Sequence, residues 1–297
     1  MLRILYAPLF CFGLIGLATW LVGYRQLSPL WLLALLPVAI LLSLLAERLA
    51  PYQPSWNRPH GDGPSDLLHA LVNEALNLAS LAAIPLLAGL LPTPALWPLH
   101  WPLWLQLLLA IAAADLGITL MHWLSHRSAL LWRLHAVHHS APRLYGFNGL
   151  MKHPLHQLLE ASAGVLPLVL LGLPQDIAAL LAFAIAVQLL LQHGNVDMRI
   201  GALRHLFAWA PLHRFHHLRY GRAGDVNFAL FFSFWDRLLG TAFYRADYRL
   251  GDQDVGIGDR PNYPRDYLAQ LLEPFRASAP SAVTPQTPAA LRSIQQP

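Results

Sequence analysis

The chain has 297 residues, of which 56% are hydrophobic and only 12% are charged. Soluble domains carry about 25% charged residues, so this composition excludes an ordinary soluble domain and indicates an integral membrane protein. The formal charge of +4 does not indicate a nucleic-acid partner, because the arginines flank apolar segments and follow no nucleic-acid-binding motif.

Four apolar segments have about the length of a membrane-crossing helix, roughly 20 residues. They cover residues 4–22, 29–45, 67–91 and 103–121. Only Arg3 precedes the first, and no small-residue cleavage site follows it, so we expect a retained helix and not a signal peptide. A further apolar stretch, 158–192, is interrupted at 172–176 by Gly and Pro, which predicts a short helical hairpin that either spans the membrane or is re-entrant.

Basic residues of the short loops favour one orientation in the membrane. Arg25 lies on one side, and seven residues lie on the other: Arg3, Arg48, Arg58, Arg127, Arg133, Arg143 and Lys152. Because cytoplasmic loops are enriched in Lys and Arg, this pattern predicts a multi-pass protein, in a bacterial inner membrane, whose histidine-rich part is cytoplasmic. The expected fold is therefore all-α: an integral membrane helical bundle of about four spans plus the short hairpin, with a cytoplasmic histidine-rich helical cap.

Eight of the fifteen histidines fall into three clusters beside apolar segments: His122 and His126; His135, His138 and His139; and His213, His216 and His217. Residues three and four apart share one face of a helix, so each cluster can direct its imidazoles to one region. Eight or nine nitrogens fit two metals better than one, since a tetrahedral zinc site takes four ligands. Zinc, copper, iron and nickel all accept imidazole. The alternatives are a pH-sensing patch or adventitious metal binding.

Isolated histidines are more often hydrogen-bonded core or interface residues than ligands. We therefore leave His60, His69, His100 and His205 outside the site. Cys11 is the only cysteine, which removes any disulfide or thiolate-ligand hypothesis.

The chain divides by composition into four parts. We expect N-terminal transmembrane helices over 1–100, a catalytic module with the three histidine boxes over 101–245, a C-terminal cytoplasmic extension over 246–276 and a disordered tail over 277–297.

Further motifs accompany the three boxes in a fixed order. Phe147-Asn148 follows the second box, Gln192-His193-Gly194-Asn195 precedes the third, and Asn227 and the run 234–241 follow it. With these motifs, the region from about Ala114 to Phe243 resembles the fatty acid hydroxylase and sterol desaturase superfamily of membrane di-iron enzymes. The sequence Ala46-Glu47-Arg48, followed by Pro51, is a weaker similarity.

The resemblance implies that the eight box histidines and His193 hold two iron ions, with zinc as an alternative or a substitute. It makes His153 and His156 possible further ligands or supporting groups. Five side chains could orient the imidazoles by accepting their free N–H groups, as such groups commonly do: Asn148, Asn195, Asp197, Asn227 and Asp236. No catalytic side chain beyond the metal ligands is implied.

The resulting functional hypothesis is a membrane oxidoreductase that hydroxylates or desaturates a lipid, such as a fatty acyl, sterol-like or ether lipid, with O2. Electrons are expected from an external donor, because the chain has neither a Rossmann glycine fingerprint nor a cysteine-histidine haem motif. Two alternatives remain: a zinc-dependent, non-oxygenase membrane enzyme of lipid metabolism, and a metal-binding membrane protein.

Overall fold

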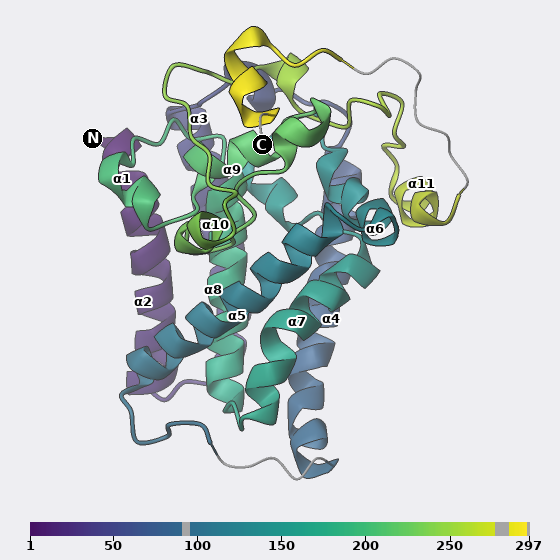
Figure 1. The fold of residues 1–297 in the computed structure, drawn as a ribbon. Coiled ribbons are helices and arrows are strands. Elements are labelled where there is room, and N and C mark those ends of the chain that lie inside the picture. Colours follow the sequence, from purple (N-terminus) through teal and green to yellow (C-terminus); the bar gives the residue numbers. More distant parts are fainter. Residues whose placement is uncertain (91–95, 277–284, 296–297) are drawn as a thin grey trace.

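A computed structural model describes residues 1–90, 96–276 and 285–295 (Figure 1). The described residues form helices and no β-sheet; strand-like pairing is limited to three isolated bridges, Pro51–Val196, Phe207–Phe232 and Leu218–Val255. The expected all-α helical bundle is thus confirmed.

Within the described residues, five helices are long and apolar enough to cross a membrane: Leu2–Tyr24, Pro29–Leu49, Gly63–Leu86, Leu103–Ser125 and Gln175–His193. The first contains α1 (Leu2–Pro8) and α2 (Leu14–Thr19), joined through a π-helical turn. The next three correspond to α3 (Leu32–Leu49), α4 (Gly63–Leu90) and α5 (Leu103–Ser125). All four predicted spans are therefore present.

The predicted hairpin consists of α7 (Pro154–Leu170) and α8 (Gln175–His193). Gly172 lies between them with φ +88°, a left-handed conformation that glycine adopts without steric cost. Of the two alternatives left open for this hairpin, the length and hydropathy of α8 fit a full span. The described part of the chain therefore contains five candidate spans.

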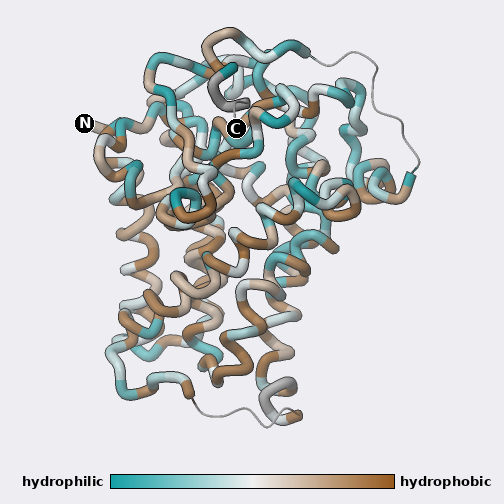
Figure 2. Tube along the Cα trace, viewed as in Figure 1, coloured by the Kyte–Doolittle hydropathy of each residue, from teal (hydrophilic) through white to brown (hydrophobic). Residues whose placement is uncertain are grey.

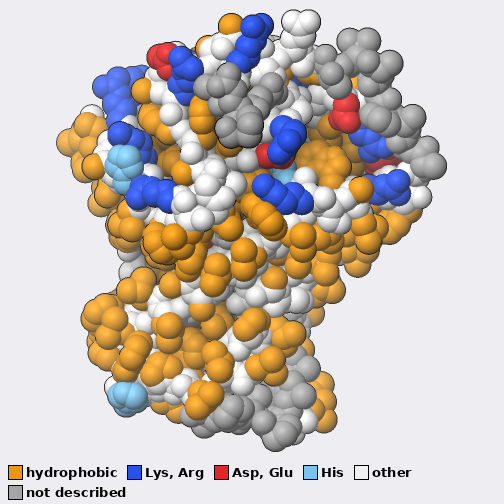
Figure 3. Space-filling view, in the orientation of Figure 1, with side chains coloured by type: hydrophobic (Ala, Val, Ile, Leu, Met, Phe, Trp, Pro, Cys, Tyr) orange, Lys and Arg blue, Asp and Glu red, His pale blue; other side chains and the backbone are white. Residues whose placement is uncertain are grey.

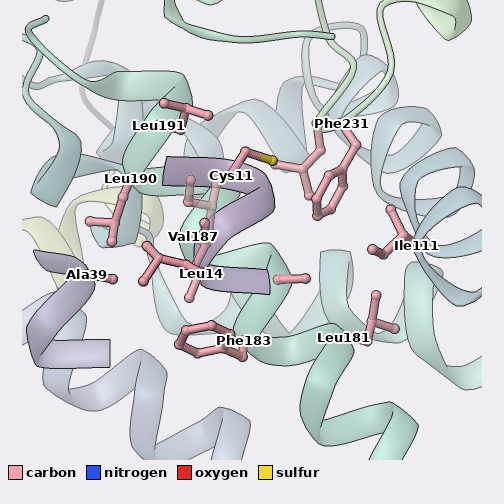
Figure 4. Close-up of a cluster of buried hydrophobic side chains, with 14 of the residues drawn as sticks. Cys11, Leu14, Ala39, Ile111, Leu181, Phe183, Val187, Leu190, Leu191 and Phe231 are labelled. Carbon is pink, nitrogen blue, oxygen red and sulfur yellow. The ribbon is translucent and has the colours of Figure 1, made fainter. Parts of the chain in front are cut away.

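Helix α8 forms the centre of the bundle. Its side chains Leu181, Val187 and Leu190 are buried, and they pack in a cluster with Leu14 of α2 and Ala39 of α3 (Figure 4). Lipid tails are as apolar as these side chains, so within a membrane such a cluster stabilises the fold through close van der Waals packing and not through transfer from water. The position of α8 matters for the site, because its last residue is His193.

Helices α5 and α7 cross at a very short distance. A Cβ atom added at Gly117 would lie 2.2 Å from the carbonyl oxygen of Ala163, and one at Gly164 would lie 2.8 Å from a side-chain carbon of Ile118. Small residues permit such close approach of helices in membranes. The crossing brings the histidine-bearing end of α5 beside the start of α7.

The remaining helices form a cap at one end of the bundle: α6 (Ala129–His139), α9 (Ala210–His216), α10 (Phe234–Leu238) and α11 (Tyr267–Leu272). Short 3-10 turns lie at Pro54–Asn57, Gly146–Leu150, Gly201–His205, Gly221–Gly224, Asp252–Asp254, Glu273–Phe275 and Ala289–Gln295. The cap is more hydrophilic than the helices below it (Figure 2). Basic side chains gather on the cap, whereas the visible surface of the bundle is mainly hydrophobic (Figure 3).

Part of the C-terminal tail packs against the cap. Leu291 is fully buried in a cap cluster with Tyr52, Trp56 and Leu250. The composition of the tail favoured disorder, but this one apolar side chain anchors it to the cap. Residues 277–284 and 296–297 lie outside the described residues.

Candidate metal centre

The structure brings together all nine histidines proposed as ligands. Five form one group, His122, His126, His135, His139 and His216, and four form a second, His138, His193, His213 and His217. Within each group, one ligand atom from each residue lies within 4.8 Å of all the others. They come from four helices: α5 ends beside His126, α6 carries the second box, α8 ends at His193 and α9 carries the third box.

His139 is central to the five-histidine group. Its Nε2 lies 3.2 Å from Nε2 of His126, 3.0 Å from that of His135 and 3.0 Å from that of His216. Nε2 of His122 lies 2.8 Å from Nε2 of His216. Imidazole nitrogens that bind one ion at about 2.1 Å are roughly 3.0 to 3.4 Å apart, so this spacing suits a shared metal ion.

His193 has the same role in the four-histidine group. Its Nε2 lies 3.0 Å from Nε2 of His138, 3.1 Å from that of His213 and 3.2 Å from that of His217. All four side chains are at most 3% exposed. The four-histidine group is thus a closed, all-nitrogen set.

Each HxxHH box serves both groups. In the second box, His135 and His139 belong to the five-histidine group, and His138 belongs to the four-histidine group. In the third box, His213 and His217 belong to the four-histidine group, and His216 belongs to the five-histidine group. Residues at i and i+4 lie one above the other on a helix, and the residue at i+3 is rotated to the side. The spacing therefore divides the ligands between two neighbouring points.

In several rings, the hydrogen bond of Nδ1, the nitrogen that faces away from the other imidazoles, determines which nitrogen carries the proton. Nδ1 of His122 bonds to the carbonyl of Phe228, and Nδ1 of His216 bonds to that of Val226. In the other group, Nδ1 of His138 bonds to Met151 O and Nδ1 of His193 to Leu189 O. A carbonyl only accepts, so each Nδ1 carries the proton, and each Nε2 of a neutral ring presents a lone pair.

Two such lone pairs face each other in each group. The contacts between Nε2 of His122 and His216, at 2.8 Å, and of His138 and His193, at 3.0 Å, lack a proton to share between neutral rings. Protonation is disfavoured, because burial and a neighbouring imidazole hold the pKa of His138 and of His216 well below the ordinary value. A cation between the nitrogens removes the repulsion, so the donor set fits a metal in each group.

The groups that orient the imidazoles are not the predicted ones. Backbone carbonyls accept four of the outer N–H groups, and one carboxylate, Asp225, lies 3.0 Å from Nδ1 of His126. Asp225 could not be found from sequence, because it follows the third box in a loop with no recognisable motif.

The predicted supporting residues instead hold the backbone around the site. Asn148 and Asn195 bond to nearby backbone, Asp197 pairs with Arg3, and Asn227 bonds to Leu212 O and to the backbone of Phe243. The expected direct contact with the imidazoles is therefore wrong for these four. The three asparagines are short side chains that satisfy backbone groups in the connecting loops first, whereas Asp197 pairs with the side chains of Arg3 and Arg249.

Asp236 and Asp115 hold the loop that contacts His122. Asp236 accepts hydrogen bonds from the backbone N–H of Phe228 and Ala229, at 2.6 and 3.1 Å. Asp115, fully buried within α5, accepts three from the backbone of 230–232, at 2.8 to 3.1 Å. Asp236 thus acts on His122 through Phe228, and Asp115 was missed because a lone aspartate in an apolar helix has no partner visible in sequence.

His156 and Glu160 extend the five-histidine group. Their ligand atoms and that of His135 lie within 4.8 Å of one another, and Glu160 forms a 2.5 Å ion pair with Lys152. His156 therefore lies where a further ligand or supporting group would be expected. His153 does not, because it caps α7 at Leu155 N and bonds to Leu271 O.

The four isolated histidines lie apart from both groups. His69 is buried and bonds to Lys152 O and to Gln270, which matches the expected core role. Neither it nor His60, His100 or His205 belongs to a possible ligand group among the described residues.

Comparison with known proteins gives the family. The sequence pattern of the family described as "Fatty acid hydroxylase" matches residues 107–241, which contain all nine histidines. The chain is 32% identical over 281 residues to the ornithine lipid hydroxylase OlsE of Rhizobium tropici, covering 92% of this chain and 83% of that protein. The chain belongs to the fatty acid hydroxylase and sterol desaturase superfamily.

Two further members of the superfamily match over a smaller part of the chain. Methylsterol monooxygenase 1 of Rattus norvegicus is 29% identical over 126 residues, 41% of each chain. The same enzyme of Gallus gallus is 28% identical, over 41% of this chain and 40% of that one. No solved structure matches the chain. The resemblance inferred from the motifs is confirmed, and the protein is a multi-pass membrane oxidoreductase of the lipid hydroxylase type.

Proposed function

We propose that the protein is a di-iron lipid hydroxylase that uses O2 and an external electron donor, and that its nine clustered histidines are the iron ligands. The observation that supports this most directly is the convergence of nine Nε2 atoms in groups of five and four, with facing lone pairs in each. Bound iron supplies the redox chemistry that activates O2 toward an unreactive C–H bond.

The histidines would hold the metals in a water-poor environment. Helices α5, α6, α8 and α9 bury the imidazoles, and every one of the nine except His126 is at most 7% exposed. Exclusion of water limits side reactions of a reactive site. The chain's own residues thus bind, orient and shield, and no side-chain acid or base is required.

A lipid has an apolar route to the centre. A cavity of about 250 Å³ lies between α4, α7 and α8, and its lining includes Ile84, Leu166 and Ala182. Leu166 is 43% exposed on the outer surface of the bundle, so the cavity opens toward lipid. Lys152 and Glu160 line the same cavity, and Glu160 lies beside His135 and His156. An acyl chain that enters between these helices would therefore approach the five-histidine group.

A second apolar cavity adjoins the first and extends the apolar space along α4 and α8. It has a volume of about 330 Å³, lies farther from the cap and shares the lining residues Asn77, Leu81 and Ala182 with the first. Two adjoining cavities along α4 and α8 suit a long chain better than a compact polar molecule.

An ornithine lipid is the substrate class we favour. Similarity to the ornithine lipid hydroxylase extends over 92% of the chain, including the membrane helices, whereas similarity to the sterol enzymes covers 41%. Helix α4, which lines both apolar cavities, lies outside residues 107–241 that the family pattern matches. The proposed location is a bacterial inner membrane with the cap in the cytoplasm, supported by the seven basic residues expected on that side.

The test is product analysis in a bacterium that makes ornithine lipids but no hydroxylated form. We expect expression of the chain to add one oxygen atom to the ornithine lipid pool, and growth under isotopically labelled O2 to label that atom. His138→Ala should abolish the product. His205→Ala is the matched control, because His205 is exposed and outside both groups, and it should retain the product.

Two outcomes would refute the proposal. A product that forms equally without O2 would favour the zinc-dependent alternative, in which the imidazoles activate water. Retention of the labelled product by His138→Ala would show that the four-histidine group is not required.

A further inference from the structure

A polar cavity lies in the cap, apart from the lipid route. It has a volume of about 330 Å³, and its lining consists of 197–201, Arg204, 244–246, 248–250, Tyr52 and part of α9. Neither iron-binding group contributes a residue to its lining. The proposed hydroxylation therefore does not account for this cavity.

The lining of the cavity is strongly basic. Five arginines contribute to it and one acidic residue, Asp197, does: the arginines are Arg199, Arg204, Arg214, Arg245 and Arg249. Asp197 is shared, at 3.0 Å from Arg3 and 3.6 Å from Arg249, and Arg245 pairs with Asp247. Pairing with carboxylates thus leaves an excess of positive charge in one concave region.

Arg214 is the innermost of these arginines. It is 2% exposed, stacks 3.8 Å from the ring of Tyr52 and donates from Nη2 to Gly194 O and Val196 O, at 2.6 and 2.8 Å. Its Nε is buried and has no hydrogen-bond partner among the described residues. Burial of a guanidinium charge is costly unless other groups compensate it, so Arg214 places a fixed positive charge at the inner wall of the cavity.

The cavity lies at the level where the first membrane helix begins. Arg3, in the first turn of Leu2–Tyr24, pairs with Asp197, and its carbonyl accepts from the backbone N–H of Arg199 at 2.7 Å. The start of a span lies near the lipid headgroups, where phosphates are abundant. Arg199 is exposed, and the side chain of Arg249 is 55% exposed, so the cavity is accessible from outside.

We propose that this cavity binds the phosphate group of a ligand, with an anionic phospholipid headgroup as its source. Guanidinium groups match phosphate oxygens with paired N–H donors, and several arginines around one cavity can surround a single phosphate. The site tethers a structural lipid beside the N-terminal helix, next to the third histidine box. It is independent of the proposed hydroxylation.

The experiment uses the full chain in mild non-ionic detergent, stripped of lipid. One arm measures binding of phosphatidylglycerol by native mass spectrometry, with diacylglycerol, which lacks the phosphate, for comparison. The other arm titrates inorganic phosphate by calorimetry. We compare wild type with Arg199→Gln/Arg204→Gln and with Arg48→Gln/Arg133→Gln, which removes the same charge from exposed arginines outside this cavity.

We expect the Arg199/Arg204 variant to bind phosphatidylglycerol at least about tenfold more weakly than wild type and the control, with no difference for diacylglycerol. If the Arg199/Arg204 variant bound inorganic phosphate more weakly but phosphatidylglycerol as well as wild type does, the cavity would be a phosphate site whose ligand is not a lipid. Equal binding by all three proteins in both arms, or equal weakening in both variants, would overturn the proposal.

The melting temperature of each variant establishes that it is folded. Should the double variant melt earlier than wild type, Arg199→Gln alone replaces it. The Arg199 side chain is exposed and forms no ion pair among the described residues, so its loss should leave the fold intact.

Discussion

Replacing His216 or His138 with alanine should abolish hydroxylation. His216 contacts both His122 and His139 in the five-histidine group, and His138 contacts His193 in the four-histidine group. Loss of a group that merely supports a ligand costs about 10- to 100-fold in metal affinity or activity, so loss of a ligand should cost at least about 100-fold. Each variant should also lose metal mainly from its own group, which metal analysis after gel filtration would measure.

His205→Ala is again the control, because it removes an exposed imidazole that belongs to neither group. Full metal content and turnover in either His138→Ala or His216→Ala would contradict the assignment of that group as a metal site.

Asp115→Ala should strongly destabilise the protein, although Asp115 is not a ligand. The change leaves three buried backbone N–H groups, of Leu230, Phe231 and Phe232, without their acceptor. At ~1 kcal/mol or more for each unpaired donor, the free energy of unfolding should fall by about 3 kcal/mol or more. The apparent melting temperature in detergent measures this loss.

The same substitution should weaken metal binding, because this loop continues from Phe228, whose carbonyl orients His122. Asp176→Ala serves as the control: Asp176 is an exposed carboxylate at the start of α8, and its loss should change the melting temperature little. An unchanged melting temperature for Asp115→Ala would show that the hydrogen bonds of the 230–232 backbone do not stabilise the fold.

The features that could be predicted from sequence are those set by patterns within a short stretch of the chain. The spans were visible as apolar runs, and the break at Gly172 separated α7 from α8 as expected. The i, i+3 and i, i+4 spacing of the boxes determined which imidazoles share a face, and His193 was recognisable only through its motif. These features depend on neighbouring residues within one or two helical turns.

Long-range contacts were not predictable in the same way. Asp225 meets His126 across 99 positions, and Asp115 meets the backbone of Phe231 across 116. Such pairs are created by tertiary packing, and no pattern within a single helix indicates them. The burial of Leu291 in the cap is a third example, because the composition of its own segment favours disorder.

The central claim is that two iron ions lie in the two histidine groups. Its most direct test is the metal content of protein purified anaerobically in mild detergent, with O2 uptake followed after reduction. We expect about two irons per chain, one for each group, and O2 uptake that requires reductant and lipid. Stable zinc with no O2 uptake, even after reconstitution with iron, would contradict it.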